Sequence, residues 1–369
     1  MSASSESSAM NHTEENIRAA LGADVDPYLG QDLVTAGAVL AIDMTSSPPR
    51  IKIELGFPVA RYGAELETRL RQVLQAQGLA ASFEISAKIV AREVQKGTKP
   101  LPQIRNIIAI ASGKGGVGKS TTAANLAIAL QQEGGKVGVL DADIYGPSQT
   151  RMLASGGRPE SRDGKSMEPR VSYGLQTISI GNLIEEDTPM IWRGPMVTGA
   201  LEQLLSDTNW HDLDYLVIDL PPGTGDIQLT LCQKIPVSGA VIVTTPQDIA
   251  LLDARKALKM FEKVNVPVLG IVENMSVHIC SNCGHAEHIF GAGGGQSMAT
   301  QYGVDLIGSL PLDIAIREGV DNGRPTVAIS PDSAVSGMYR EIARRVAAKL
   351  ALRARDFTAK FPKIVIQNT

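Results

Sequence analysis

The stretch IIAIASGKGGVGKST, residues 107–121, decides the fold of this 369-residue chain. An apolar run, residues 107–111, comes first, and a loop with four glycines and two lysines follows it directly. From Gly113 to Ser120 the loop fits the pattern G-x-x-x-x-G-K-[ST], which cradles phosphates when a strand precedes it and a helix follows. Residues 119–132 have the length and composition of that helix. The stretch therefore predicts a phosphate-binding loop in a nucleotide-binding domain.

Residues of the loop have distinct expected roles. Lys119 is expected to contact the β and γ phosphates of a nucleotide, and the Ser120 hydroxyl to bind Mg²⁺. The glycines let the backbone curl around the phosphates, and the helix that begins near Lys119 directs its positive end toward them. The residues predicted to bind the nucleotide are Gly113, Lys114, Gly115, Gly116, Val117, Gly118, Lys119, Ser120 and Thr121.

The chain from residue 104 repeats the order strand, loop, helix. Further apolar runs lie at residues 137–140, 215–218, 240–243, 268–272 and 306–310, and helix-length segments at 119–132, 195–206, 249–263 and 332–352. Continuous apolar strands separated by helices indicate a mostly parallel sheet covered on both faces. The predicted fold class is therefore α/β, a Rossmann-like P-loop NTPase domain with its site at the carboxyl ends of the strands.

The first hundred residues have a different character. Residues 38–44 and 50–57 alternate like a hairpin, residues 64–77 have a helical period, and residues 82–90 alternate again. They predict a small α+β domain in front of the P-loop domain. The expected boundaries are a disordered N-terminus over 1–15, an α+β domain over 16–95, a linker rich in proline and glycine over 96–103, and the P-loop domain over 104–369.

The composition and net charge argue against nucleic acid and membranes as general binding partners of the chain. Charged residues make up 20% of the chain, hydrophobic residues 43%, and the formal net charge is −4. A mildly acidic chain has no general attraction for nucleic acid or anionic lipid. No apolar stretch approaches the roughly 18 residues that a membrane helix needs, and the polar start lacks the apolar region of a secretory signal. We therefore expect a cytoplasmic protein with no nucleic-acid partner and no stable membrane association.

Carboxylates follow two of the predicted strands. Asp141 and Asp143 come at the end of the run VGVLDAD, and Asp219 ends the run YLVID. Carboxylates at strand ends beside a phosphate loop can bind Mg²⁺ and its waters or position an attacking water. The alternative for each is a turn or helix cap.

Lys114 adds a second cation to the loop. If it pointed inward it would duplicate Lys119. If it pointed outward it would reach the nucleotide of a facing subunit and stabilise charge that develops during phosphoryl transfer. The spacing alone leaves this role and that of a solvated loop lysine equally open, and the first role requires a dimer.

Three cysteines are present, and two of them, Cys280 and Cys283, form a C-x-x-C pair. Cys232 lies in a helical segment and is expected in the core. The pair has three interpretations. It is a redox dithiol, although no helix N-terminus is evident, or a zinc site that recruits His285 and His288 at an awkwardly short spacing. The third is half of a four-thiolate [4Fe-4S] site that a second copy completes across a two-fold axis.

The loop KGGVGKST resembles the deviant Walker A motif of the MinD, ParA and nitrogenase iron protein class of dimeric ATPases. The resemblance implies that Lys114 acts across the dimer interface and that Asp143 is the switch I residue near the attacking water. It also implies that Asp219 is the Walker B residue on magnesium and that Asp141 assists through the water shell of the metal. The implied catalytic residues are Lys114, Lys119 and Asp143.

The same resemblance gives roles to loops that follow two later strands. In the class, the asparagine at the position of Asn274 reads the adenine. The loop at the position of Pro311 and Asp313 borders the base. A turn-forming asparagine is the alternative for Asn274.

Residues 104 to about 327 resemble the Mrp/ApbC family of iron-sulfur cluster carrier ATPases. The matching stretches are SGKGGVGKS (112–120), DADIYGPS (141–148), WRGPM (192–196), DLDYLVIDLPPGTGDIQLTL (212–231), TTPQDIALLDARK (244–256), ENMS (273–276) and CSNCG (280–284). The resemblance implies a homodimer that uses ATP and Mg²⁺ and binds a labile [4Fe-4S] cluster at Cys280 and Cys283. Apo iron-sulfur proteins and a cluster-assembly scaffold are the implied partners. Ile314 stands where relatives often have proline.

The N-terminal region, with DPYLGQDLVTAGAV (26–39), resembles the MIP18-type domain often fused to these carriers. Related free-standing domains usually carry a cysteine after the second strand, and no cysteine precedes residue 232 here, so a docking or scaffold role is expected.

The main alternative function is a positioning ATPase of the MinD/ParA kind that acts on membrane or DNA. For this function the basic helix 338–355 would lie on anionic lipid. The favoured interpretation is a helix that packs on the sheet with its arginines in water. The residues expected to face inward are Met338, Ile342, Val346 and Leu350.

Overall fold

The computed structural model describes residues 13–95, 98–183, 194–280 and 282–360. The chain forms two compact units, Met1–Ile89 and Val90–Thr369. Residues 90–95, expected in the first domain, belong to the second unit. The first helix, α1, begins at Glu14, so residues 14 and 15 are helical where the sequence predicted disorder. Residues 1–12, residues 96 and 97 of the predicted linker, and residues 192 and 193 of the WRGPM stretch lie outside the described residues.

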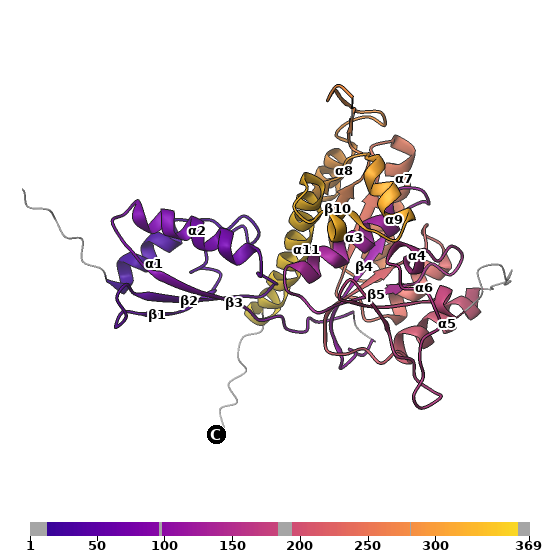
Figure 1. The fold of residues 1–369 in the computed structure, drawn as a ribbon, viewed down its shortest axis with the longest axis horizontal. Coiled ribbons are helices and arrows are strands. Elements are labelled where there is room, and N and C mark those ends of the chain that lie inside the picture. Colours follow the sequence, from indigo (N-terminus) through magenta and orange to yellow (C-terminus); the bar gives the residue numbers. More distant parts are fainter. Residues whose placement is uncertain (1–12, 96–97, 184–193, 281, 361–369) are drawn as a thin grey trace, which may run out of the picture. The chain divides into compact units, whose positions relative to one another are not determined.

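The first unit packs two helices against a small sheet (Figure 1). Its elements are α1 Glu14–Gly22, β1 Val39–Asp43, β2 Arg50–Leu55, α2 Tyr62–Gln75 and β3 Ser82–Ala87. β1 and β2 pair antiparallel as the hairpin that the alternation predicted, and β3 pairs parallel to β2. The alternation buries every second residue of β2, while Leu66, Leu70 and Leu74 of α2 form the buried helical face.

The second unit is built on a mostly parallel sheet, which confirms the predicted α/β fold. Within the described residues the sheet has eight strands in the order β13-β10-β9-β4-β8-β5-β7-β6, and the pair β6 and β7 is antiparallel. The strands are β4 Ile104–Ala111, β5 Val137–Asp141, β6 Arg170–Ser172, β7 Leu175–Ser179, β8 Leu213–Asp219, β9 Gly239–Thr244, β10 Val268–Glu273 and β13 Leu306–Ser309. Six of them lie at the predicted apolar runs, whereas the sequence analysis missed β6 and β7.

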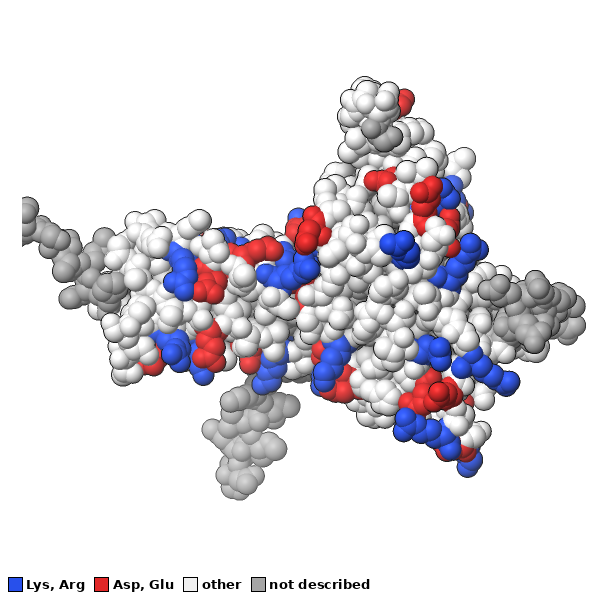
Figure 2. Space-filling model, viewed as in Figure 1, with Lys and Arg blue, Asp and Glu red and all other residues white. Residues whose placement is uncertain are grey.

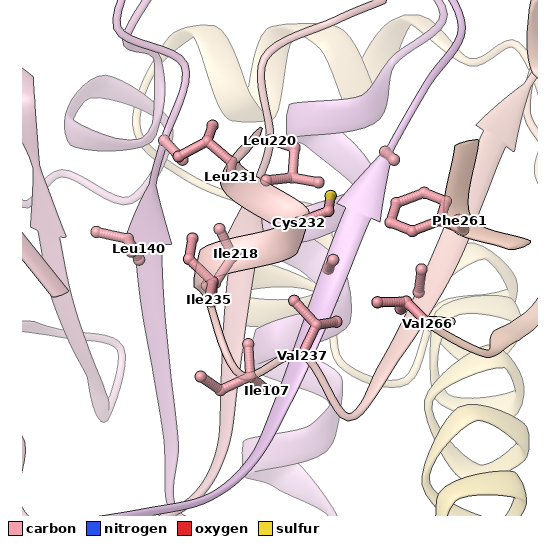
Figure 3. Close-up of a cluster of buried hydrophobic side chains, with 14 of the residues drawn as sticks. Ile107, Leu140, Ile218, Leu220, Leu231, Cys232, Ile235, Val237, Phe261 and Val266 are labelled. Atoms are coloured by element: carbon pink, nitrogen blue, oxygen red, sulfur yellow. The ribbon is translucent and has the colours of Figure 1, made fainter. Parts of the chain in front are cut away.

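Helices cover both faces of this sheet (Figure 1). α3 Lys119–Gln132 and α11 Ala334–Lys360 pack together on one face. The other face carries α5 Gly194–Ser206, α6 Asp226–Lys234, α7 Asp248–Lys263 and α8 Gly294–Tyr302. Cys232 of α6 points into the apolar cluster on that face, near Leu220 and Phe261 (Figure 3). Burial raises the pKa of its thiol to about 12, so Cys232 is a core residue as predicted.

Helix α11 packs on α3 and on the sheet, with a face that differs in part from the predicted one. Ile342, Val346 and Leu350 are buried as expected, but Met338 is 39% exposed. Arg344 is buried rather than in water, because it forms an ion pair at 2.8 Å with Glu133, which caps the C-terminus of α3. The apolar face of α11 is therefore used for packing within the unit, and the alternative in which it lies on lipid is not supported.

The surface carries charges of both signs. On the face in Figure 2, Lys and Arg side chains lie next to Asp and Glu side chains. Among the described residues, no helix is both long and apolar enough to cross a membrane.

Candidate nucleotide site and cysteine pair

The phosphate loop joins β4 to α3 through backbone that glycine adopts most freely. Gly116 and Gly118 have φ angles of +80° and +82°, in the left-handed region. A Cβ on Gly113 would lie 2.1 Å from the carbonyl carbon of Asp253, so the loop passes directly against α7. A Cβ on Gly115 or Gly116 would meet open space as far as the described residues extend. The loop thus presents open backbone at the N-terminus of α3, an arrangement that favours phosphate binding.

Lys119 is buried in the first turn of α3 and faces carboxylates. Its ammonium forms an ion pair with Asp219 at the end of β8, lies 3.8 Å from an oxygen of Asp143 and lies 3.3 Å from the Ser120 hydroxyl. The side chain of Asp219 is fully buried. Asp141 adds a third carboxylate, so negative charge exceeds the single ammonium. An excess of buried carboxylate suits a divalent cation.

Asp141 is fully buried at the end of β5, and its carboxylate accepts four hydrogen bonds. Burial and the neighbouring Asp219 raise the pKa of Asp141 to about 7. Burial also raises the pKa of Asp143, against the opposing effect of the Lys119 ammonium. The donors to Asp141, at 2.9 to 3.1 Å, are the backbone N–H groups of Asp143, Ser148 and Gln149 and the hydroxyl of Ser179.

Gln149 is a member of the site that the sequence analysis missed. It begins α4 Gln149–Met152, and its amide donates to Asp219 at 2.9 Å and to the Ser120 carbonyl at 3.0 Å. Two buried oxygens, Gln149 Oε1 and Ser148 Oγ, have no hydrogen-bond partner among the described residues. The Gln149 amide contacts Asp219 and Ser120, and the Ser148 N–H donates to Asp141. Unpaired buried oxygens on these two residues are suitable ligands for Mg²⁺ or its waters, so the residues fit a magnesium-bound nucleotide.

The loops after β10 and β13 adjoin the phosphate loop. Asn274 donates from Nδ2 to the Val117 carbonyl at 2.9 Å, and a Cβ on Gly118 would lie 2.1 Å from the same nitrogen. Asp313 accepts a backbone N–H in the first turn of α9 Ile314–Asp321 and so caps that helix. Pro311 is buried two residues earlier. Asn274 therefore supports the loop itself, and the contact of these residues with the base stays a prediction.

Lys114 differs from Lys119 in its surroundings. It is half-buried, and its ammonium forms no ion pair with any residue that the structure describes. Its carbonyl accepts a hydrogen bond from the Ser112 hydroxyl at 2.9 Å, which fixes the backbone there. Thr121 follows Ser120 in the first turn of α3. The predicted nucleotide residues 113–121 thus form one continuous segment, the loop after β4 and the start of α3.

Cys280 and Cys283 lie at the tip of a hairpin formed by β11 His278–Ile279 and β12 Ala286–Glu287. Backbone N–H groups of Cys283 and Asn282, together with the Cys283 thiol, donate to the sulfur of Cys280 and lower its pKa. Cys283 is exposed. N–H groups directed at a sulfur stabilise the thiolate, which is the form that binds iron.

The histidines beside the pair are oriented by backbone carbonyls. His288 Nδ1 donates to the Ser276 carbonyl at 2.6 Å, and His278 Nδ1 donates to the Leu312 carbonyl at 3.1 Å. In the described part of the chain, no three His, Cys, Asp or Glu side chains are grouped so that they could hold a metal ion. The alternative of a zinc site built from His285, His288 and the two cysteines is therefore not supported by the described residues.

Comparisons with known proteins show the family of the chain. The chain matches the ParA family model described as NUBPL iron-transfer P-loop NTPase over residues 103–347. It is 61% identical over 265 residues to the iron-sulfur cluster carrier protein of Pseudomonas fragi, which covers 71% of this chain and 92% of that protein. It is 49% identical over 282 residues to the iron-sulfur cluster transfer protein NUBPL of Mus musculus, with 76% and 88% covered. A nucleotide-binding protein from Archaeoglobus fulgidus, solved with ADP, is 38% identical with a TM-score of 0.53, covering 60% of this chain and 88% of that chain.

Proposed function

Because this chain belongs to the family of NUBPL-type iron-transfer P-loop NTPases, we propose that it is an ATP-hydrolysing carrier of a labile [4Fe-4S] cluster. One observation carries the proposal. A single compact unit contains both a phosphate loop beside buried carboxylates and a thiol pair whose first sulfur is stabilised as thiolate. The first group of residues suits a magnesium nucleotide and the second suits iron.

The nucleotide would be bound by the loop and by residues at the strand ends. The backbone N–H groups of residues 113–121 and the Lys119 ammonium would hold the β and γ phosphates. Ser120 and Asp219 would hold Mg²⁺, which supplies charge neutralisation at the phosphates. Lys119 must leave its ion pair with Asp219 to reach a phosphate, and the metal then gives that carboxylate a new partner. Asp143, beside Lys119, would orient the attacking water.

A second copy of the chain would complete the cluster site. One chain offers two thiols at the hairpin tip, and a [4Fe-4S] cluster takes four thiolates. A two-fold axis brings identical residues together, so two hairpins supply the full set. The same arrangement gives a role to Lys114, whose ammonium would face the nucleotide of the partner. We therefore propose a homodimer as the form that carries the cluster.

The exposed position of Cys283 suits transfer of the cluster to another protein. An incoming thiolate of an apo iron-sulfur protein would displace the chain's thiolates one at a time, so that iron never loses its sulfur ligands. The first unit contains none of the three cysteines of the chain, so we propose that it docks a donor scaffold or an acceptor and leaves the cluster to the hairpin.

The test is anaerobic reconstitution with iron and sulfide, followed by metal analysis and visible absorption. Wild type should bind about one cluster per dimer, as the four-thiolate count requires. Cys280→Ser and Cys283→Ser should lose it while ATP hydrolysis continues. Cys232→Ala is the matched control and should keep the cluster, because that thiol is in the core. Transfer is then read from the activity of an apo [4Fe-4S] enzyme. Equal iron in all four proteins would reject the assignment of the cysteine pair.

Lys119→Ala tests the nucleotide half. This variant should lose hydrolysis yet still bind the cluster. Undiminished hydrolysis would place the nucleotide site elsewhere in the chain.

A further inference from the structure

Glu273, the last residue of β10, and Asn274, which follows it, contact two different parts of the unit: the start of α8 and the phosphate loop. Glu273 is 4% exposed and Asn274 is 7% exposed. Asn274 donates to the Val117 carbonyl in the phosphate loop at 2.9 Å. Glu273 accepts the backbone N–H of Gly295 at 2.5 Å, in the first turn of α8. Two neighbouring residues thus join the loop to the helix that follows the cysteine hairpin.

Both contacts are tight. A Cβ on Gly118 would lie 2.1 Å from Asn274 Nδ2, and a Cβ on Gly295 would lie 2.8 Å from Glu273 Oε2. The two side chains therefore pack directly against glycine backbone, so neither the side chain nor the glycine can move without displacing the other. The Glu273 carboxylate lies at the N-terminus of α8, where it accepts a backbone N–H of the first turn. A shift of either backbone segment has to be followed by its partner.

Hydrogen bonds hold the cysteine hairpin both where the chain enters it, before β11, and where the chain leaves it, after β12. It stands out from the unit next to α8 (Figure 1). On the entry side, the Ser276 N–H donates to the Leu310 carbonyl at 2.9 Å, and the Leu312 N–H donates to the Val277 carbonyl at 2.8 Å. His288 closes the base by donating to the Ser276 carbonyl. The segment before β11 begins at Asn274, and the segment after β12 runs into the first turn of α8, which Glu273 contacts. Both ends of the hairpin are therefore connected to the dipeptide 273–274.

We propose that Glu273 is a positioning residue, which together with Asn274 makes the exposure of the cysteine pair depend on the nucleotide bound at the phosphate loop. The inference rests on the proposed function, because it takes residues 113–121 as the nucleotide site. Phosphates bound by the loop fix the Val117 peptide and hence Asn274. The β10 backbone carries that constraint one residue to Glu273, and the carboxylate carries it to the start of α8 and the hairpin.

The experiment measures alkylation of the cysteine pair, Cys280 and Cys283, by a maleimide in the cluster-free protein, with and without Mg²⁺ and ATP. Cys232 is buried and does not compete. In wild type, nucleotide should change the rate at least about five-fold, the lower end of typical coupling between two sites. Glu273→Ala should remove that dependence, and Glu273→Gln should restore most of it, because an amide oxygen still accepts the Gly295 N–H. Glu287→Ala, an exposed glutamate of the same hairpin, is the matched control and should behave as wild type.

ATP affinity, measured in parallel with a fluorescent nucleotide, separates the outcomes. Glu273→Ala should bind ATP with nearly the affinity of wild type, since the Glu273 carboxylate contacts Gly295 of α8 and distant sites act almost independently. A nucleotide response that survives in Glu273→Ala overturns the inference. So does a wild-type protein that binds ATP but shows no change in alkylation. A wild-type protein that binds no ATP at all instead contradicts the proposed function. If Glu273→Ala does not fold, Glu273→Asp replaces it, because the side chain that is shorter by one methylene withdraws the carboxylate from the Gly295 N–H, and it should lose the same response.

Discussion

Nucleotide binding should depend on pH through Asp141. This carboxyl is fully buried next to Asp219, and its pKa is raised to about 7. A magnesium ion beside Asp219 favours the ionised form of Asp141, so binding of the magnesium nucleotide should release the proton that Asp141 carries. The sign follows directly: affinity rises as the pH rises, because at higher pH less of the free protein has to lose a proton.

The size of the effect follows from the titration of one group. With a pKa of about 7, about 9% of the free protein is ionised at Asp141 at pH 6 and about 91% at pH 8, so the affinity should rise about ten-fold. At pH 7, about half a proton should be released for each nucleotide bound. Asp141→Asn should remove most of this slope, since the amide does not titrate.

Isothermal titration calorimetry with a non-hydrolysable ATP analogue gives both quantities. Excess Mg²⁺ keeps the terminal phosphate of the nucleotide ionised, and buffers with different heats of ionisation give the number of protons released. A wild-type affinity that is flat from pH 6 to pH 8 would refute the reasoning. An unchanged slope in Asp141→Asn would trace the proton to another group.

Three other perturbations test separate contacts. Gly118→Ala places a Cβ at a φ of +82° and 2.1 Å from Asn274 Nδ2, so nucleotide binding should weaken by at least the ~1–2 kcal/mol cost of left-handed backbone; unchanged binding by fluorescence titration would show that the loop relaxes. Glu133→Ala removes one partner of a buried ion pair with Arg344, which should cost ~3–5 kcal/mol in urea unfolding, and a loss below ~1 kcal/mol would contradict this. Lys114→Ala should keep nucleotide binding and lose hydrolysis in a steady-state phosphate assay, whereas normal turnover would return Lys114 to a solvated loop residue.

Much of the fold could be predicted because its strands are apolar along their whole length. β4, β8 and β9 are buried on both faces, so their sequences read as continuous runs bounded by polar loops. β7 could not be found in this way. Its sequence LQTIS includes three polar residues, and its place in the sheet depends on tertiary contacts such as the hydrogen bond from Ser179 to Asp141.

In the site, too, residues within short sequence motifs could be predicted, whereas residues whose partners lie far along the chain could not. The phosphate loop and the residues at strand ends are local patterns, so Lys119 and Asp219 could be named before their contact was known. Gln149 could not, because its partner Asp219 lies 70 positions further along the chain. The burial of Arg344 was missed for a similar reason: helical periodicity gives the apolar face of α11, but not the glutamate that lies beneath it on α3.

The hydrogen bonds that lower the pKa of Cys280 also make the cysteine pair more reactive toward oxidants whenever no cluster is bound. A thiolate next to an exposed thiol is the arrangement in which a peroxide forms a sulfenic acid that the neighbour then closes into a disulfide. Closure removes two electrons and oxidises both of the proposed iron ligands at once, so a reductant must return those electrons before a cluster could be loaded. The supply of thiol reductant, as well as the supply of iron, would then determine the fraction of the protein that can bind a cluster.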